Sequence, residues 1–177
     1  MTEYIPKTFT FNIPIRPKAV QSTRFARGHS FVDAKTKKWK AAVKEVLKLN
    51  IPETPSPFPF EVVEAVYTFQ LPKSLTKKAR KRIEEAWERG EDVAYINTPD
   101  LDSNINKGLS DLLTDVGLWE DDRRMWRIAK DAVVKKVYGK TDGIRLTVRE
   151  TPFVMLGTGK TAMEEFGGHL GAAESSS

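Results

Sequence analysis

The sequence contains no cysteine, only two histidines and no long uninterrupted hydrophobic run. The lack of cysteine excludes disulfide bonds, thiolate zinc sites and a cysteine nucleophile. His29 and His169 lie too far apart in the sequence to form a paired metal-ligand motif. A membrane-spanning helix needs about 20 apolar residues in succession, and no such run is present. Because the chain also opens directly into polar sequence, without a secretory signal, we expect a cytoplasmic protein.

The composition is that of a folded globular protein. Of the 177 residues, 40% are hydrophobic and 30% are charged, which distinguishes the chain from an intrinsically disordered one. This length is sufficient for one domain with its own core. We predict a single domain over residues 1–150. Residues 151–177, which end in small and polar residues, are predicted to be a partly disordered tail.

Positive charge is concentrated near the start of the chain. The net charge is +5, and residues 7–50 hold eleven lysines and arginines against two acidic residues. A localised basic surface is expected for a protein that binds a polyphosphate such as DNA, although a solvated basic surface without a partner has the same composition. The residues from which we expect phosphate contacts are Arg16, Lys18, Arg24, Arg27, Lys37, Lys38 and Lys40.

Alternating apolar residues predict four strands, over residues 8–13, 61–71, 128–138 and 144–148. The third strand has imperfect alternation, which indicates a bulge near Asp131. The turn residues between the third and fourth strands predict that these two strands form a hairpin. Residues 17–31 have no period and are predicted to be a basic loop.

Helical spacing of apolar residues predicts three helices. The first is capped by Asp33 and ends near Asn50, and the second is capped by Ser74 and ends at Gly90. The third begins after Asp102 and ends at Gly117. The order strand–helix–strand–helix–helix–strand–strand predicts an α+β domain with helices packed on a mixed sheet.

The most distinctive stretch surrounds the start of the third helix. Asp100 and Asp102 follow Pro99, and alternate side chains of an extended segment share a face, so these carboxylates can converge. The turn after the helix then brings Asp121 and Asp122. Such a cluster offers the oxygen ligands that a hard divalent cation prefers, Mg²⁺ in particular.

Each carboxylate also has an ordinary structural interpretation. Asp102 is a good helix N-cap, and Asp121 and Asp122 can belong to a polar turn. A D-x-D motif alone is short and weakly specific. Lys107 in the same helix and the basic surroundings favour a metal site that handles phosphate.

The order of these residues resembles the core of the RusA-type Holliday-junction resolvases. The matching residues are Pro99-Asp100-Leu101-Asp102, Asn104, Lys107, Asp111-Leu112-Leu113 and Gly117-Leu118-Trp119-Glu120-Asp121-Asp122. The family pattern reads D-x-D-N-x-x-K, a helix, and then an aromatic residue with D-D. This chain departs from the pattern at Ser103, an extra residue between the second aspartate and the asparagine. The resemblance extends over residues 8–150.

The resemblance implies a homodimeric endonuclease, of a kind often encoded by phages, that acts in the cytoplasm of a bacterial host cell. Its substrate would be a four-way DNA junction, resolved by paired symmetric nicks during recombination and repair. The resemblance implies Mg²⁺, for which Mn²⁺ can substitute. The implied metal ligands are Asp100, Asp102, Asp121 and Asp122, and the implied catalytic residues are Asp100, Asp102, Asp122 and Lys107.

Two other functions fit parts of the sequence. A catalytically inactive DNA-binding or phage assembly factor would keep the basic surface without needing a metal. A sugar or phosphoryl transferase would use the D-x-D motif, although the basic N-terminal region disfavours this function. No nucleotide cofactor is expected, because Val154 replaces the first glycine that a Walker A loop around Gly159-Lys160 would need.

Overall fold

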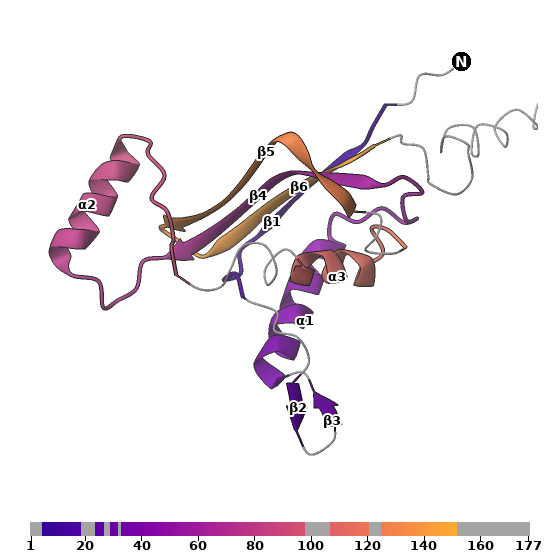
Figure 1. Cartoon of the computed structure of the whole chain (residues 1–177), viewed down its shortest axis with the longest axis horizontal. Helices are drawn as coiled ribbons and strands as arrows, with labels where there is room; N and C mark the ends of the chain where they lie inside the picture. Colours follow the sequence, from indigo (N-terminus) through magenta and orange to yellow (C-terminus); the bar gives the residue numbers. More distant parts are fainter. Residues whose placement is uncertain are drawn as a thin grey trace, which may run out of the picture.

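The structure is a computed structural model that describes residues 5–18, 24–26, 29–31, 33–97, 107–120 and 125–151. Its main elements follow the predicted order, and the predicted α+β class is confirmed (Figure 1). The strands of the main sheet are β1 (Thr8–Ile13), β4 (Phe60–Gln70), β5 (Met125–Gly139) and β6 (Gly143–Glu150). The helices are α1 (Ala34–Lys48), α2 (Lys77–Glu88) and α3 (Lys107–Asp115).

Two short strands were missed in the region predicted to be a loop. β2 (Arg24–Ala26) and β3 (His29–Phe31) pair antiparallel as a small separate sheet. The hairpin lies at the end of α1 that points away from the main sheet (Figure 1). Strands of three residues are too short to show a hydrophobic period, which explains why the sequence pattern did not reveal them.

The main sheet has the strand order β1-β6-β4-β5, with β4 parallel to β5 and the other neighbouring pairs antiparallel. The predicted hairpin between β5 and β6 is therefore wrong, because β4 lies between them. The turn that joins β5 to β6 crosses the end of β4, where Gln70 N–H donates to Asp142 Oδ1 at 2.8 Å and Gln70 Nε2 donates to Lys140 O at 3.2 Å. Local alternation identifies strands but does not choose their partners.

β4 changes the face that it presents to the core partway along its length. Its pairing with β5 and β6 shifts register between Val62 and Glu64, and on β5 the shift falls between Ile128 and Val133. The bulge predicted near Asp131 is thus confirmed in position. Val63 lies two residues before the buried Ala65 but is only half-buried, because the extra residue reverses the alternation.

The core lies between the sheet and the two helices α1 and α3, which cover the same face (Figure 1). Fully buried side chains come from the strands, from both helices and from the segment after α3, and each contributes about 1.5–3 kcal/mol through burial of apolar surface. The largest of them are Trp119, Tyr67, Phe11, Phe60, Phe69, Ile13, Leu47, Leu109, Leu112, Leu113 and Leu118.

α2 stands at one end of the sheet, away from α1 and α3 (Figure 1). Its N-cap is Thr76, whose hydroxyl accepts from Ala79 N–H at 3.3 Å, and not Ser74 as predicted. Gly90, with a φ of 75°, follows its last turn in the left-handed conformation, so the predicted end of the helix is confirmed. Only Ala86 of this helix is buried.

Of the predicted tail, only Thr151 is among the described residues, where its N–H donates to Pro59 O at 2.8 Å. The remaining tail residues lie outside them. None of the helices in the described ranges is both long enough and apolar enough to span a lipid bilayer.

Candidate active site

The predicted metal ligands lie in two segments outside the described residues. Asp100 and Asp102 belong to residues 98–106, and Asp121 and Asp122 belong to residues 121–124. Lys107 is the first residue of α3. The structure therefore describes the scaffold that holds both ends of each segment, and the convergence of the carboxylates stays a prediction.

The chain that leads into the first aspartate pair is attached to the outer edge of β5. Tyr95 N–H donates to Lys136 O at 3.0 Å, and the Tyr95 ring stacks on Phe69 with 3.9 Å between the ring centroids. Lys136 Nζ donates to Asn97 O at 2.9 Å, and Asn97 Nδ2 lies 3.4 Å from the hydroxyl of Tyr138. Asn97, the last described residue before the D-x-D segment, is thus fixed against the sheet.

α3 is fixed by its apolar side. Leu109, Leu112 and Leu113 are each at most 2% exposed, so the apolar spacing that predicted this helix does mark its buried side. Asp115, at the other end of the helix, forms an ion pair with Lys44 of α1 at 2.7 Å. Because the core holds α3 along its length, the backbone of its first residue, Lys107, has a defined place.

The segment that enters the second aspartate pair is anchored by Trp119. This side chain is 1% exposed, and its ring lies 5.0 Å from that of Phe60 between centroids. Its Nε1–H donates to Thr114 Oγ1 at 2.7 Å, so the apolar surface of the indole is buried and its polar atom has a hydrogen-bond partner. Asp121 therefore follows, by only two residues in the sequence, the Trp119 side chain that is fixed in the core.

A buried hydrogen-bond chain supports the residue before Trp119. Ser56 N–H donates to Leu118 O at 3.0 Å, and the Ser56 hydroxyl donates to Glu150 Oε1 at 2.6 Å. The second carboxylate oxygen of Glu150 accepts from Lys7 N–H at 3.0 Å. Buried polar groups with every partner in place hold one local geometry. These hydrogen bonds join the segment between α1 and β4, strand β6 and the segment after α3.

Glu61 fixes the start of β5, which follows the second aspartate pair. Its side chain is 3% exposed and pairs with Arg127 of β5 at 2.7 Å and with Arg149 of β6 at 2.6 Å. Burial by itself raises the pKa of Glu61, but the hydrogen bonds from Arg149 and Arg127 outweigh this effect and lower its pKa. Because both arginines sit directly opposite Glu61 in the strand register, the carboxylate ties three strands together.

Sequence reasoning did not identify Glu61 as important. The available signal was an acidic residue at the start of a strand and an arginine on each of two later strands. That signal acquires meaning only when the strand order is known, because it places both arginines beside the same carboxylate.

Two of the predicted DNA-binding residues, Arg16 and Lys18, have partners within the protein. The Arg16 guanidinium lies 5.7 Å from the Phe69 ring centroid and 3.5 Å from Asp142, and its side chain is 58% exposed. Lys18 Nζ donates to Thr36 Oγ1 at 2.8 Å and lies 3.6 Å from Asp33 at the start of α1. Arg16 thus keeps most of its surface toward solvent, whereas Lys18 also supports the helix cap.

The Asp33 cap is confirmed and carries a clear electrostatic signature. Thr36 donates to it through both its N–H, at 2.9 Å, and its hydroxyl. These hydrogen bonds, with a smaller contribution from Lys18, lower the pKa of Asp33 to about 2.

The predicted lysines of α1 are divided between two sides of the helix. Lys37 and Lys38 are exposed and Lys40 is half-buried. At about 100° per residue, Lys37 and Lys40 share the side of Lys44, which pairs with α3, whereas Lys38 lies about 100° from Lys37. Arg24 opens β2 in the separate hairpin, and Arg27 lies outside the described residues.

The sequence matches the family model described as Endodeoxyribonuclease RusA over residues 14–149. The chain belongs to the RusA endodeoxyribonuclease family. The match spans all three helices, both aspartate segments and Lys107, so the resemblance seen in the sequence is confirmed. A comparison with curated proteins found no match.

RusA nucleases are endonucleases of Holliday junctions and generally depend on a divalent metal ion, so family membership supports this class of activity. Within the ranges that the structure describes, no three histidine, aspartate or glutamate side chains are grouped as a metal site. The donor set of the two aspartate segments does fit such an ion, since Mg²⁺ is bound by carboxylate oxygens together with water and substrate phosphate.

Proposed function

We propose that this RusA-family protein is a Mg²⁺-dependent endonuclease that acts as a homodimer and resolves four-way DNA junctions by paired symmetric nicks. The observation that carries the proposal is the family match, which spans both aspartate segments and the helix between them. The anchored positions of Asn97, Trp119 and Glu61 support it, because a catalytic site needs its ligands on rigid supports.

In this proposal, each aspartate and Lys107 has a defined role. Asp100, Asp102, Asp121 and Asp122 would hold Mg²⁺, for which Mn²⁺ can substitute, and of the adjacent pair Asp122 is the essential member. The bound ion would supply an activated water and charge stabilisation at the phosphate. Lys107, at the start of α3, would offset the negative charge that develops on the scissile phosphate.

The basic residues of the N-terminal part would hold the DNA arms through phosphate contacts. Such contacts carry shape recognition more than sequence recognition, which suits a junction-selective enzyme. A two-fold dimer would present two sites to a substrate with two equivalent strands.

The decisive experiment compares nicking of a synthetic four-way junction and of a linear duplex with the same sequences, with Mg²⁺ and with a chelator. We expect cleavage of the junction alone, and only with Mg²⁺. Asp102→Asn and Asp122→Asn should abolish cleavage while they retain junction binding, because the amide keeps the shape but loses the charge that attracts the metal. Glu53→Gln, a change at an exposed loop carboxylate, serves as the control.

Cleavage of the linear duplex at a comparable rate would contradict junction selectivity. Near wild-type cleavage by both asparagine variants would remove these aspartates from the site. Binding without cleavage under any metal condition would favour the inactive DNA-binding alternative. A supercoiled plasmid with an extruded cruciform tests the paired nicks, since a resolving dimer should linearise it directly.

A further inference from the structure

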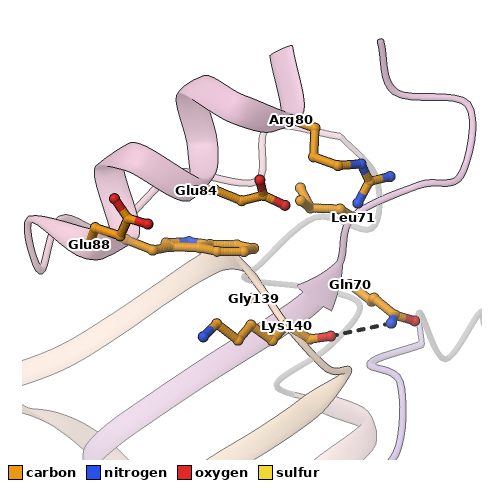
Figure 2. Close-up of a pocket in the computed structure, with 8 residues that line it drawn as sticks. Gln70, Leu71, Arg80, Glu84, Glu88, Gly139 and Lys140 are labelled. Carbon is orange, nitrogen blue, oxygen red and sulfur yellow. Dashed lines mark hydrogen bonds between the residues drawn. The ribbon is translucent and has the colours of Figure 1, made fainter. Parts of the chain in front are cut away.

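α2 and the adjoining end of the sheet border a half-open cavity of about 580 Å³ (Figure 2). This volume falls within the range of about 300–1,000 Å³ that is usual for small-molecule sites. The cavity is lined by Gln70, Leu71, Arg80, Glu84, Trp87, Glu88, Gly139 and Lys140.

The walls of the cavity are held in place from both sides. On the sheet side, Gln70 bonds to both ends of the turn that carries Lys140. On the helix side, Arg80 Nη2 donates to Pro72 O at 3.2 Å, and Glu91 N–H donates to Ala86 O at 2.9 Å beyond the last turn. The backbone walls of the cavity therefore need little rearrangement when a ligand enters.

The lining combines an aromatic ring, carboxylates and cationic side chains. Trp87 is half-buried, so part of its indole stays accessible. Figure 2 shows Arg80 and Glu84 projecting from α2, with Lys140 across the cavity on the turn. Within the described part of the chain, neither the Glu84 carboxylate nor the Lys140 ammonium forms a salt bridge.

We propose that this cavity binds one unpaired nucleotide of the DNA substrate, with its base against the Trp87 indole. The proposal rests on the proposed function, because it takes branched DNA as the ligand. Four of the lining residues have a counterpart in such a nucleotide. The indole stacks with the base, the Glu84 carboxylate accepts from an exocyclic amino group, and Arg80 and Lys140 bind phosphate.

The charge around the cavity favours a nucleic-acid strand over a small cationic ligand. Glu84 and Glu88 could also attract a cation, but Arg80 and Lys140 balance their charge within the lining, so the surrounding residues decide the sign of the local field. Further basic residues surround the start of α2 and raise the local concentration of a polyanion. They are Lys73, Lys77, Lys78, Lys81 and Arg82.

The test measures binding of fluorescent single-stranded hexanucleotides, all cytosine or all thymine, by anisotropy. Trp87→Leu should weaken both by about five- to 150-fold, the range of one lost base–aromatic stack, and Trp87→Phe should weaken them less. Glu84→Gln should weaken the cytosine strand by about tenfold relative to the thymine strand, because only cytosine offers an exocyclic amino group. Lys140→Gln should weaken both strands equally.

Glu53→Gln is the matched control at an exposed position and should bind both strands like the wild type. Thermal unfolding of each variant excludes misfolding as the cause of weak binding, and the exposed residues Glu84 and Lys140 test the cavity without touching the core. Unchanged binding by Trp87→Leu would overturn the proposal. An equal gain for both strands in Glu84→Gln would also overturn it, because that result is simple loss of repulsion.

The result separates this subsite from the catalytic proposal. If the wild type nicks junctions and Trp87→Leu still binds both strands normally, only the nucleotide subsite is contradicted. If the wild type binds hexanucleotides through Trp87 but never nicks a junction, the catalytic function is contradicted and the subsite is supported.

Discussion

α3 and α2 are both short helices with one apolar side, yet they occupy different places in the molecule. α3 buries Leu109, Leu112 and Leu113 against the sheet, whereas α2 buries only Ala86. The comparison shows that an apolar helix side does not by itself place a helix in the core. α3 serves as a rigid support beside the aspartate segments, and α2 is left with a partly exposed indole and a ligand-sized cavity.

The largest effect should come from the first residue of α3. Lys107→Ala should lower the single-turnover cleavage rate by about a hundredfold or more, since it removes a cation from the developing charge. Lys107→Arg should restore part of the rate, because its planar fork places the donors differently. The matched change at the first residue of α2, Lys77→Ala, should weaken DNA binding while the rate at saturating DNA stays at the wild-type value. Equal rates for the two alanine variants would remove Lys107 from the site.

Truncation of an apolar side chain should lower the free energy of unfolding more in α3 than in α2. Leu112→Ala should lower the free energy of unfolding by about 3 kcal/mol, because it leaves a cavity in a fully buried position. Ile83→Ala on the half-buried side of α2 should cost less than about 1 kcal/mol. Urea unfolding measures both values, and similar losses would show that α2 belongs to the core.

Loss of an ion pair should likewise lower the free energy of unfolding more in the main sheet than beside α2. Glu61→Gln should lower the free energy of unfolding by about 1–3 kcal/mol, since it leaves Arg127 and Arg149 without their shared carboxylate. This range is below that of a fully buried pair, because both arginines are partly exposed to solvent. The corresponding change at the exposed Arg89–Glu91 pair beyond α2, Glu91→Gln, should leave unfolding unchanged. A neutral Glu61→Gln would show that the three strands are held by packing alone.

Salt dependence should show how the two basic regions share the DNA. If about six phosphates are neutralised, the log–log slope of binding against salt should be about −5. Replacing Arg24, Arg27 and Lys37 together with glutamine should flatten this slope and weaken binding by about tenfold. The matched triple change at Lys77, Lys78 and Arg82 tests α2 in the same way. An unchanged slope in either triple variant would place the DNA away from that region.

The smallest effect concerns the cap of α1. The pKa of Asp33 is lowered from its ordinary value of 3.8 to about 2 in the folded state, so its stabilising contribution is complete above pH 4 and is lost between about pH 4 and pH 2. Asp33→Asn keeps a capping side chain without the charge. Its deficit in stability relative to the wild type should therefore shrink as the pH falls through that range. A deficit that does not vary with pH would contradict the charged cap.

Regular local patterns in the sequence were sufficient to locate most of the elements. The stripe of α3, the Asp33 cap, the alternation in β6 and the bulge in β5 each depend on residues close together in the chain. The residue types and spacings of the aspartate segments were likewise sufficient to indicate the family. A missing pattern explains the errors at β2 and β3, which are too short to show a period.

What the sequence determined by itself was the set of elements, the apolar sides of the helices and the family motif, because short-range sterics and hydrophobic spacing encode them. The tertiary structure alone decided that β4 separates β5 from β6 and that Glu61 therefore meets Arg127 and Arg149. It also decided that α2 leaves Trp87 beside a cavity, while α3 enters the core. These outcomes depend on contacts between residues far apart in the chain, and local propensity carries no information about which distant surfaces will meet.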